Sequence, residues 1–133
     1  GAVGILSSVV AFLADAELQR GNLDEASTLA DLCEELAPDD DVASQILCKT
    51  VRAQLETRLS RLDDALSLAM SAVLLAETTD FLNAQGRAGI TLARVHAARG
   101  EFDQAKVVAQ SAVRAFTAKG NLAEAERAMV QLP

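Results

Sequence analysis

The sequence contains no tryptophan and no tyrosine, and aromatic residues make up only 3% of it. Hydrophobic residues still account for half of the chain, so its core must be built mainly from alanine, leucine and valine. Side chains of this size suit helices that pack closely together. Only two prolines, Pro38 and Pro133, are present, and turn signals at the spacing of strands are almost absent. We therefore predict an all-α protein.

Basic residues are also in short supply. Twelve lysines and arginines stand against nineteen acidic residues, which gives a net charge of −7. Direct binding to nucleic acid or to an anionic membrane needs a basic surface. The chain has no apolar run of about 18 residues, and residues 1–6 lack the basic region and cleavage site of a signal peptide. We expect no direct nucleic-acid partner and no membrane partner.

Groups for catalysis are scarce. The one histidine, His96, has no evident cluster of cysteine or carboxylate neighbours, so we interpret it as structural. There is no glycine-rich phosphate loop and no zinc-ligand spacing. The acidic run 39–41 lacks the glycine turn and distant glutamate of a calcium loop, and is interpreted as the start of a helix. We expect no catalytic residue, metal or cofactor, and hence no enzyme.

What the sequence does contain is an internal repeat. Residues 21–26 (GNLDEA), 60–65 (SRLDDA) and 100–105 (GEFDQA) share one pattern, and Ala26, Ala65 and Ala105 are 39 and then 40 residues apart. A shortened version, GNLAEA, covers residues 120–125. Small residues follow each alanine at helical spacing: Ala30 and Cys33, Ala69 and Ala72, Ala109 and Ala112. Such self-similarity is typical of an array of helical repeats.

The two cysteines are too few for a disulfide framework. Cys33 occupies a position that is alanine in the other repeats, and Cys48 lies in an apolar stretch. We expect two reduced, buried thiols, as in a cytosol. Whether the two lie close together in space stays open.

Hydrophobic periodicity and helix-end signals predict seven helices. Gly21 is expected to end the first helix, and Asn22 to cap the second with Glu25 completing a capping box. Ser60 or its neighbour, and residues 78–80, are the candidate caps of later helices. The predicted helices are about 3–20, 23–36, 42–59, 62–76, 81–99, 102–118 and 121–132.

Gly86 and Gly89 lie inside the fifth predicted helix, where each costs about 1 kcal/mol relative to alanine. We interpret them as sites where a neighbouring helix approaches closely. A ligand pressed against that backbone is the alternative.

Paired helices, the glycine before the second helix, the alanine pattern and Pro38 after the first pair resemble tetratricopeptide repeats over about residues 8–132. The period is longer than the usual 34 or so residues, and the usual tryptophan and tyrosine are missing. The resemblance implies a right-handed α–α superhelix of three hairpins with a short C-terminal capping helix. It would form one domain, 1–133, with repeats at about 3–38, 41–77 and 80–118 and a terminal helix at 121–132.

The long repeat is similar to helical regions of bacterial LuxR-type transcription factors with ATPase modules and of some class III nucleotidyl cyclases. Residues 88–132 carry most of this likeness, with the turn Ala98-Arg99-Gly100-Glu101-Phe102. The resemblance implies a fragment of a larger cytoplasmic regulator, active in signal transduction or transcription.

In such a stack the first helix of each hairpin lines the concave face. By analogy with the repeat family, the candidate binding residues are Asp15, Thr50, Gln54, Arg87, Ile90 and Arg94. Arg87 and Arg94 are seven residues apart and share a helical face, where they form either a basic spot for an anion or a solvated surface.

We therefore predict a noncatalytic interaction module whose partner is a protein or peptide, including other domains of the parent protein. A small-ligand sensor in the concave groove is the first alternative. The second is an architectural segment that forms homo-oligomers through exposed end faces.

Overall fold

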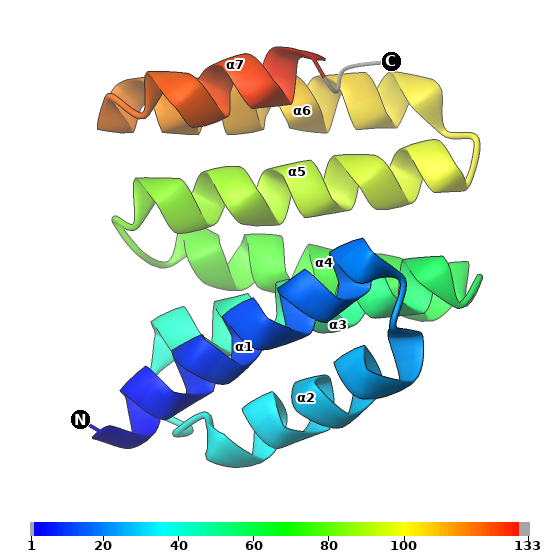
Figure 1. The fold of residues 1–133 in the computed structure, drawn as a ribbon. Helices are drawn as coiled ribbons and strands as arrows, with labels where there is room; N and C mark the ends of the chain where they lie inside the picture. Colours follow the sequence, from blue (N-terminus) through cyan, green and yellow to red (C-terminus); the bar gives the residue numbers. More distant parts are fainter. Residues whose placement is uncertain (1, 131–133) are drawn as a thin grey trace.

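The structure of the protein is a computed structural model that describes residues 2–130 (Figure 1). Within this range the chain forms seven α-helices and no strand. The all-α prediction is confirmed, and the helix ends agree with the predicted ones to within one or two residues. The predicted end of the last helix at Leu132 lies outside the described residues. The helices are α1 (Ala2–Arg20), α2 (Leu23–Leu36), α3 (Val42–Arg58), α4 (Leu62–Glu77), α5 (Leu82–Ala98), α6 (Phe102–Lys119) and α7 (Leu122–Val130).

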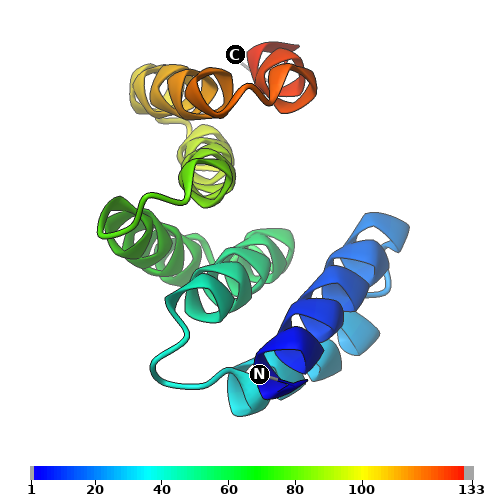
Figure 2. The same ribbon diagram turned by 90° about the vertical axis from the view of Figure 1, so that its left-hand side faces the viewer.

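The helices form three antiparallel hairpins, α1–α2, α3–α4 and α5–α6, and α7 packs on α6 (Figure 1). The first helices of successive hairpins also touch, because α3 contacts both α1 and α5. Seen along the stack, the hairpins curve into an open C, with α1 near one end and α7 at the other (Figure 2). This is the predicted superhelix of hairpins with a terminal helix.

Small side chains at the repeat positions hold each hairpin together. Ala26, Ala65 and Ala105 have no exposed surface, and the residues that follow them at helical spacing are at most 2% exposed. Small side chains on one helix let the axis of its neighbour come close, so that backbone and side-chain atoms pack at high density. The repeat pattern in the sequence therefore marks the inner face of the second helix in each hairpin.

The three hairpin turns share one backbone conformation. Gly21, Ser60 and Gly100 have φ values of 82°, 62° and 80°, in the left-handed region. The next residue then donates its backbone N–H to a carbonyl five residues earlier, at 2.9 Å in all three turns. This arrangement ends each first helix and satisfies carbonyls that would otherwise lack partners. Ser60 or its neighbour was predicted to cap α4. Ser60 instead takes the place that glycine holds in the other turns, and Arg61 occupies the N-cap position without a side-chain capping hydrogen bond.

Most of the predicted caps are wrong. Asn22 occupies the N-cap position of α2 but makes no side-chain capping hydrogen bond, and its amide Nδ2 donates to Glu17 Oε2 at 2.6 Å. The residue before α5 is Phe81, which cannot cap by its side chain, although its N–H donates to Thr79 Oγ1 at 3.1 Å. Only the acidic run behaves as predicted, since Asp41 Oδ1 accepts from the backbone N–H of Ser44 at 3.1 Å.

Candidate binding groove and the neighbouring disulfide

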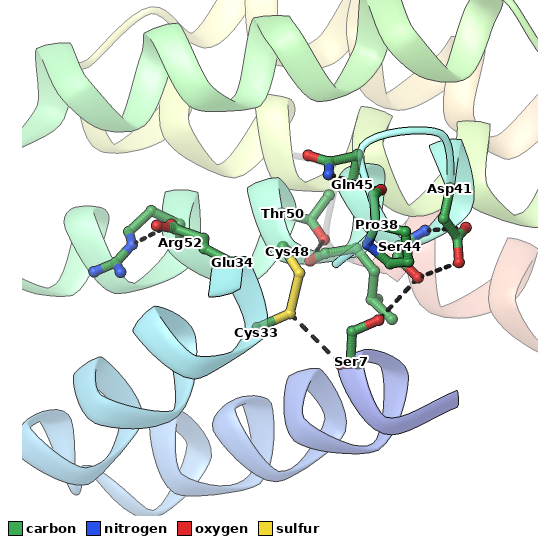
Figure 3. Close-up of a disulfide and its surroundings, with 11 residues drawn as sticks. Ser7, Cys33, Glu34, Pro38, Asp41, Ser44, Gln45, Cys48, Thr50 and Arg52 are labelled. Atoms are coloured by element: carbon green, nitrogen blue, oxygen red, sulfur yellow. Dashed lines mark hydrogen bonds and ion pairs between the residues drawn. A yellow bond between two sulfur atoms is a disulfide. The ribbon is translucent and has the colours of Figure 1, made fainter. Parts of the chain in front are cut away.

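The two cysteines form a disulfide between α2 and α3 (Figure 3). Their Cα atoms are 5.9 Å apart, and both residues are buried. The expectation of two reduced thiols is therefore wrong. The repeat pattern correctly indicated that Cys33 is buried. It does not determine the register of α2 against α3, and this register places Cys48 next to Cys33.

Polar contacts surround the disulfide and tie the first hairpin to α3 (Figure 3). Ser7 Oγ, in α1, donates to Ser44 Oγ at 2.9 Å, and Ser44 Oγ donates to Asp41 Oδ2 at 2.8 Å. On the other side, Arg52 of α3 binds two carboxylates of α2, those of Asp31 and Glu34. The junction between the first and second hairpins is therefore held by a covalent bond, buried hydroxyls and ion pairs.

A groove of about 580 Å³ lies on the concave side of the stack. Helices α1, α3, α5 and α7 supply its walls, together with Phe116 of α6. All six residues predicted for the concave face line this one groove: Asp15, Thr50, Gln54, Arg87, Ile90 and Arg94. The structure thus brings together side chains that are up to 79 positions apart in the sequence, between 15 and 94.

Charges of both signs line the groove. Burial between the arms of the C lowers the pKa of Arg94, and the negative charges of Asp15 and Glu124 oppose this shift. The Arg94 side chain still reaches solvent, so the loss of hydration is partial. Arg127 pairs with Glu124 within α7. Arg87 is exposed, and its guanidinium has neither an ion pair nor a hydrogen bond to any residue that the structure describes.

A second cavity, of about 270 Å³, adjoins the groove and shares Leu47, Thr50 and Arg87 with it. The rest of its lining comes from α1, the start of α3, and the start of α5 with the residue before it, and it is mostly apolar: Ser8, Ala43, Ile46, Phe81, Asn83 and Ala84. Ala43, Ile46, Phe81 and Ala84, the apolar residues of this cavity, were not among the predicted binding residues. The signal available in the sequence was Phe81 itself, one of only four phenylalanines, at the start of a predicted helix.

The two glycines inside α5 allow α6 to approach, as interpreted. A Cβ atom on Gly86 would lie 2.5 Å from the ring of Phe116, and one on Gly89 would lie 2.9 Å from Ala112 Cβ. The close approach of a helix is therefore the reason for these glycines. The alternative, a ligand against this backbone, has no support, because side chains of α6 already fill the space.

The family model for the tetratricopeptide repeat matches residues 8–31 and 82–111. These segments cover most of the first hairpin and most of the third, including α5 with its groove residues. The fold, three helical hairpins followed by a terminal helix, is tetratricopeptide-like. No curated protein matches it.

In this tetratricopeptide-like domain the side chain of His96 contacts Glu101 across the third hairpin turn, between α5 and α6. Its Nδ1 lies 3.0 Å from Glu101 Oε1, and Arg99 Nε donates to the same oxygen at 2.9 Å. The hydrogen bonds with His96 and then Arg99 lower the pKa of Glu101. His96 therefore has the carboxylate neighbour that the sequence reasoning missed. The same two repeat positions hold Glu17 with Asn22 and Glu56 with Arg61, so the contact across the turn is a structural element of the repeat.

Among residues 2–130, no group of three or more histidine, cysteine, aspartate or glutamate side chains is placed to hold a metal ion. No helix in the described part of the chain combines the length and the apolar character needed to span a membrane.

Proposed function

We propose that this tetratricopeptide-like domain is a noncatalytic interaction module that binds a protein or peptide segment along its concave groove. The observation that carries the proposal is the convergence of the six predicted residues on one open groove. Helical repeats of this kind generally bind partners along such a concave surface. The groove also offers polar, charged and apolar side chains, which together can recognise a peptide.

We further propose that the domain, 1–133, works inside a larger cytoplasmic regulator of the LuxR type or of the cyclase type, where its partner includes other domains of the same protein. The likeness of residues 88–132 to such regions supports this. The disulfide removes one argument for the cytoplasm, since it replaces the two free thiols on which that expectation partly rested.

Selection of random peptides displayed on phage, against the immobilised domain, tests the binding function. Enriched peptides are then titrated against the wild type and against Gln54→Trp, which places a large ring in the groove. Gln104→Trp, an exposed change on α6, is the matched control. We expect Gln54→Trp to weaken binding by about tenfold or more, because a filled groove excludes the peptide, whereas Gln104→Trp leaves it unchanged. Failure to enrich any peptide, or equal binding by both variants, contradicts the proposal.

A small-ligand sensor is the second candidate. Its support is the volume of the groove, about 580 Å³, which lies within the range of small-molecule sites. Thermal unfolding against a panel of small anions and metabolites tests it, because a ligand of the folded state raises the midpoint. A rise that Gln54→Trp abolishes supports the sensor, and no rise with any compound argues against it.

Self-association is the third candidate. One face of α1 exposes several large apolar side chains: Ile5, Leu6, Val9, Phe12 and Leu13. A face of this kind is able to pair with another copy of the domain. Sedimentation of the wild type beside Val9→Asp tests this, with a dimer that the substitution breaks as the expected result. A monomer at all concentrations rules it out.

A further inference from the structure

The charges of the groove do not balance. Three arginines line it, Arg87, Arg94 and Arg127, against two carboxylates, Asp15 and Glu124. The carboxylates are engaged with Arg94 and Arg127 by attraction and by an ion pair. One positive charge is therefore left over, although the whole chain carries −7. The residue that holds it is Arg87, which has no carboxylate partner among the described residues.

Arg87 stands where the charged groove meets the apolar cavity, because it lines both. Ile46, Phe81 and Ala84 supply apolar surface on the cavity side. A ligand that satisfies Arg87 therefore places its neighbouring group in the apolar cavity. The cavity volume, about 270 Å³, has room for one bulky apolar side chain.

Two carboxamides on the groove side favour a peptide as the ligand. Gln19 and Gln54 both line the groove, and the side chain of neither makes a hydrogen bond to any residue that the structure describes. A carboxamide both donates and accepts hydrogen bonds, so it can pair with the N–H and C=O groups of a peptide backbone. A fatty acid or simple anion offers no such series of donors and acceptors.

We propose that the groove recognises a peptide segment in which an aspartate or glutamate lies beside a bulky apolar residue. The acidic side chain pairs with Arg87, and the apolar side chain occupies the adjoining cavity. Gln19 and Gln54 bind the peptide backbone. This inference rests on the proposed function and adds the specificity of the same site. An arginine–carboxylate pair is a charge-assisted interaction with defined geometry, so it discriminates among sequences.

The test uses the same library of random peptides on phage, with four forms of the domain. Arg87→Gln removes the unpaired charge, and Phe81→Ser removes apolar surface from the cavity. Lys106→Gln is the matched control, because it makes the same change of charge on an exposed part of α6. Arg87 is exposed and Phe81 is half-exposed, so neither substitution disturbs the core. Circular dichroism confirms that each variant is folded.

We expect the wild type and Lys106→Gln to enrich an acidic residue within about two positions of leucine, isoleucine, phenylalanine or methionine. Arg87→Gln loses the acidic preference and binds the selected peptides about tenfold or more weakly. Phe81→Ser loses the apolar preference. Peptides that bind in the groove without an acidic preference, or equal binding by Arg87→Gln, overturn the inference and leave the proposed function standing. If no peptide is enriched, both fail.

Discussion

At the scale of single residues, Ser60 stands out because it adopts the left-handed conformation that glycine has in the other two turns. A side chain in this region crowds its own backbone, which costs about 1–2 kcal/mol for most residues. Glycine loses more conformational entropy on folding than serine does, and this loss offsets part of the difference in backbone energy. Ser60 therefore lowers the stability of the second turn, and its hydroxyl makes no hydrogen bond to any described residue that would offset this cost.

We predict that Ser60→Gly raises the free energy of unfolding by about 0.5–1 kcal/mol, because glycine relieves the backbone strain. Urea denaturation with linear extrapolation measures the change. Ser67→Gly, an exposed change inside α4, is the control and should lower stability by about 0.5 kcal/mol. A loss of stability in Ser60→Gly would show that the serine hydroxyl matters in the turn.

Asp41 is the one predicted cap that functions as a cap. Its carboxylate accepts hydrogen bonds from the backbone N–H and then the hydroxyl of Ser44, and these lower its pKa. Since the folded pKa lies below the unfolded one, near 3.9, the ionised cap stabilises the fold fully above that value. The contribution is lost as the pH falls through the lowered folded pKa.

We therefore predict that Asp41→Ala lowers the free energy of unfolding by about 1 kcal/mol at neutral pH. The difference from the wild type should shrink below about pH 4, where protonation weakens the native cap. Urea denaturation across this pH range measures both effects. Asp39→Ala, at an exposed neighbour in the same run, is the control and should have little effect. A pH-independent difference would argue against the ionised cap.

At the scale of elements, the packing of α5 against α6 depends on Gly86 and Phe116. Phe116 is the largest fully buried side chain and lies over the Cα of Gly86, at a distance that leaves no room for a methyl group. The same ring lines the groove. Gly86 costs about 1 kcal/mol of helix propensity relative to alanine, but its lack of a side chain leaves space for the ring of Phe116.

We predict that Gly86→Ala destabilises the domain by about 1–2 kcal/mol, because displacement of a buried ring outweighs the gain in helix propensity. In the background of Phe116→Leu, where the space is open, the same change should become neutral or stabilising. Denaturation of all four forms gives the coupling energy as a double-mutant cycle. Additive effects of the two substitutions would contradict the packing argument.

The sequence predicted the elements well where periodicity governs them. Helix ends, the buried alanines and the close approach at Gly86 all follow from spacing and residue size. The caps did not follow, because several polar residues compete at each helix start. Asn22 bonds Glu17 across the turn, and Ser60 holds a strained turn position. Such choices depend on the local backbone angles, which the residue types alone leave undetermined.

At the scale of the whole molecule, the register between hairpins decides the remaining features. The analogy with repeat proteins placed the six concave residues, since every first helix faces the same side. The disulfide and the apolar cavity depend on how one hairpin sits against the next. Cys33 and Cys48 are 15 residues apart, and only the packing of α2 on α3 brings them together.

We predict that Cys33→Ala/Cys48→Ala lowers the free energy of unfolding by about 3 kcal/mol, the value for a loop of about 15 residues. Denaturation with and without a thiol reductant measures it. The wild type should lose a similar amount when reduced, whereas the double variant should be insensitive to the reductant. A wild type that unfolds at the same denaturant concentration in both conditions would show that the two thiols are not joined.

The open C of the stack has a mechanical consequence. Its groove is lined by α1 at one end of the coil and by α7 at the other, so a bound peptide would touch both ends at once. Arg94 already lies between charges from these two helices, Asp15 and Glu124. We expect a bound peptide to draw these two ends together, whereas the disulfide joins only α2 to α3, in the first half of the stack. Peptide binding should then increase the curvature of the stack and shorten the distance between its two ends. Any segment attached to these ends would change its position accordingly.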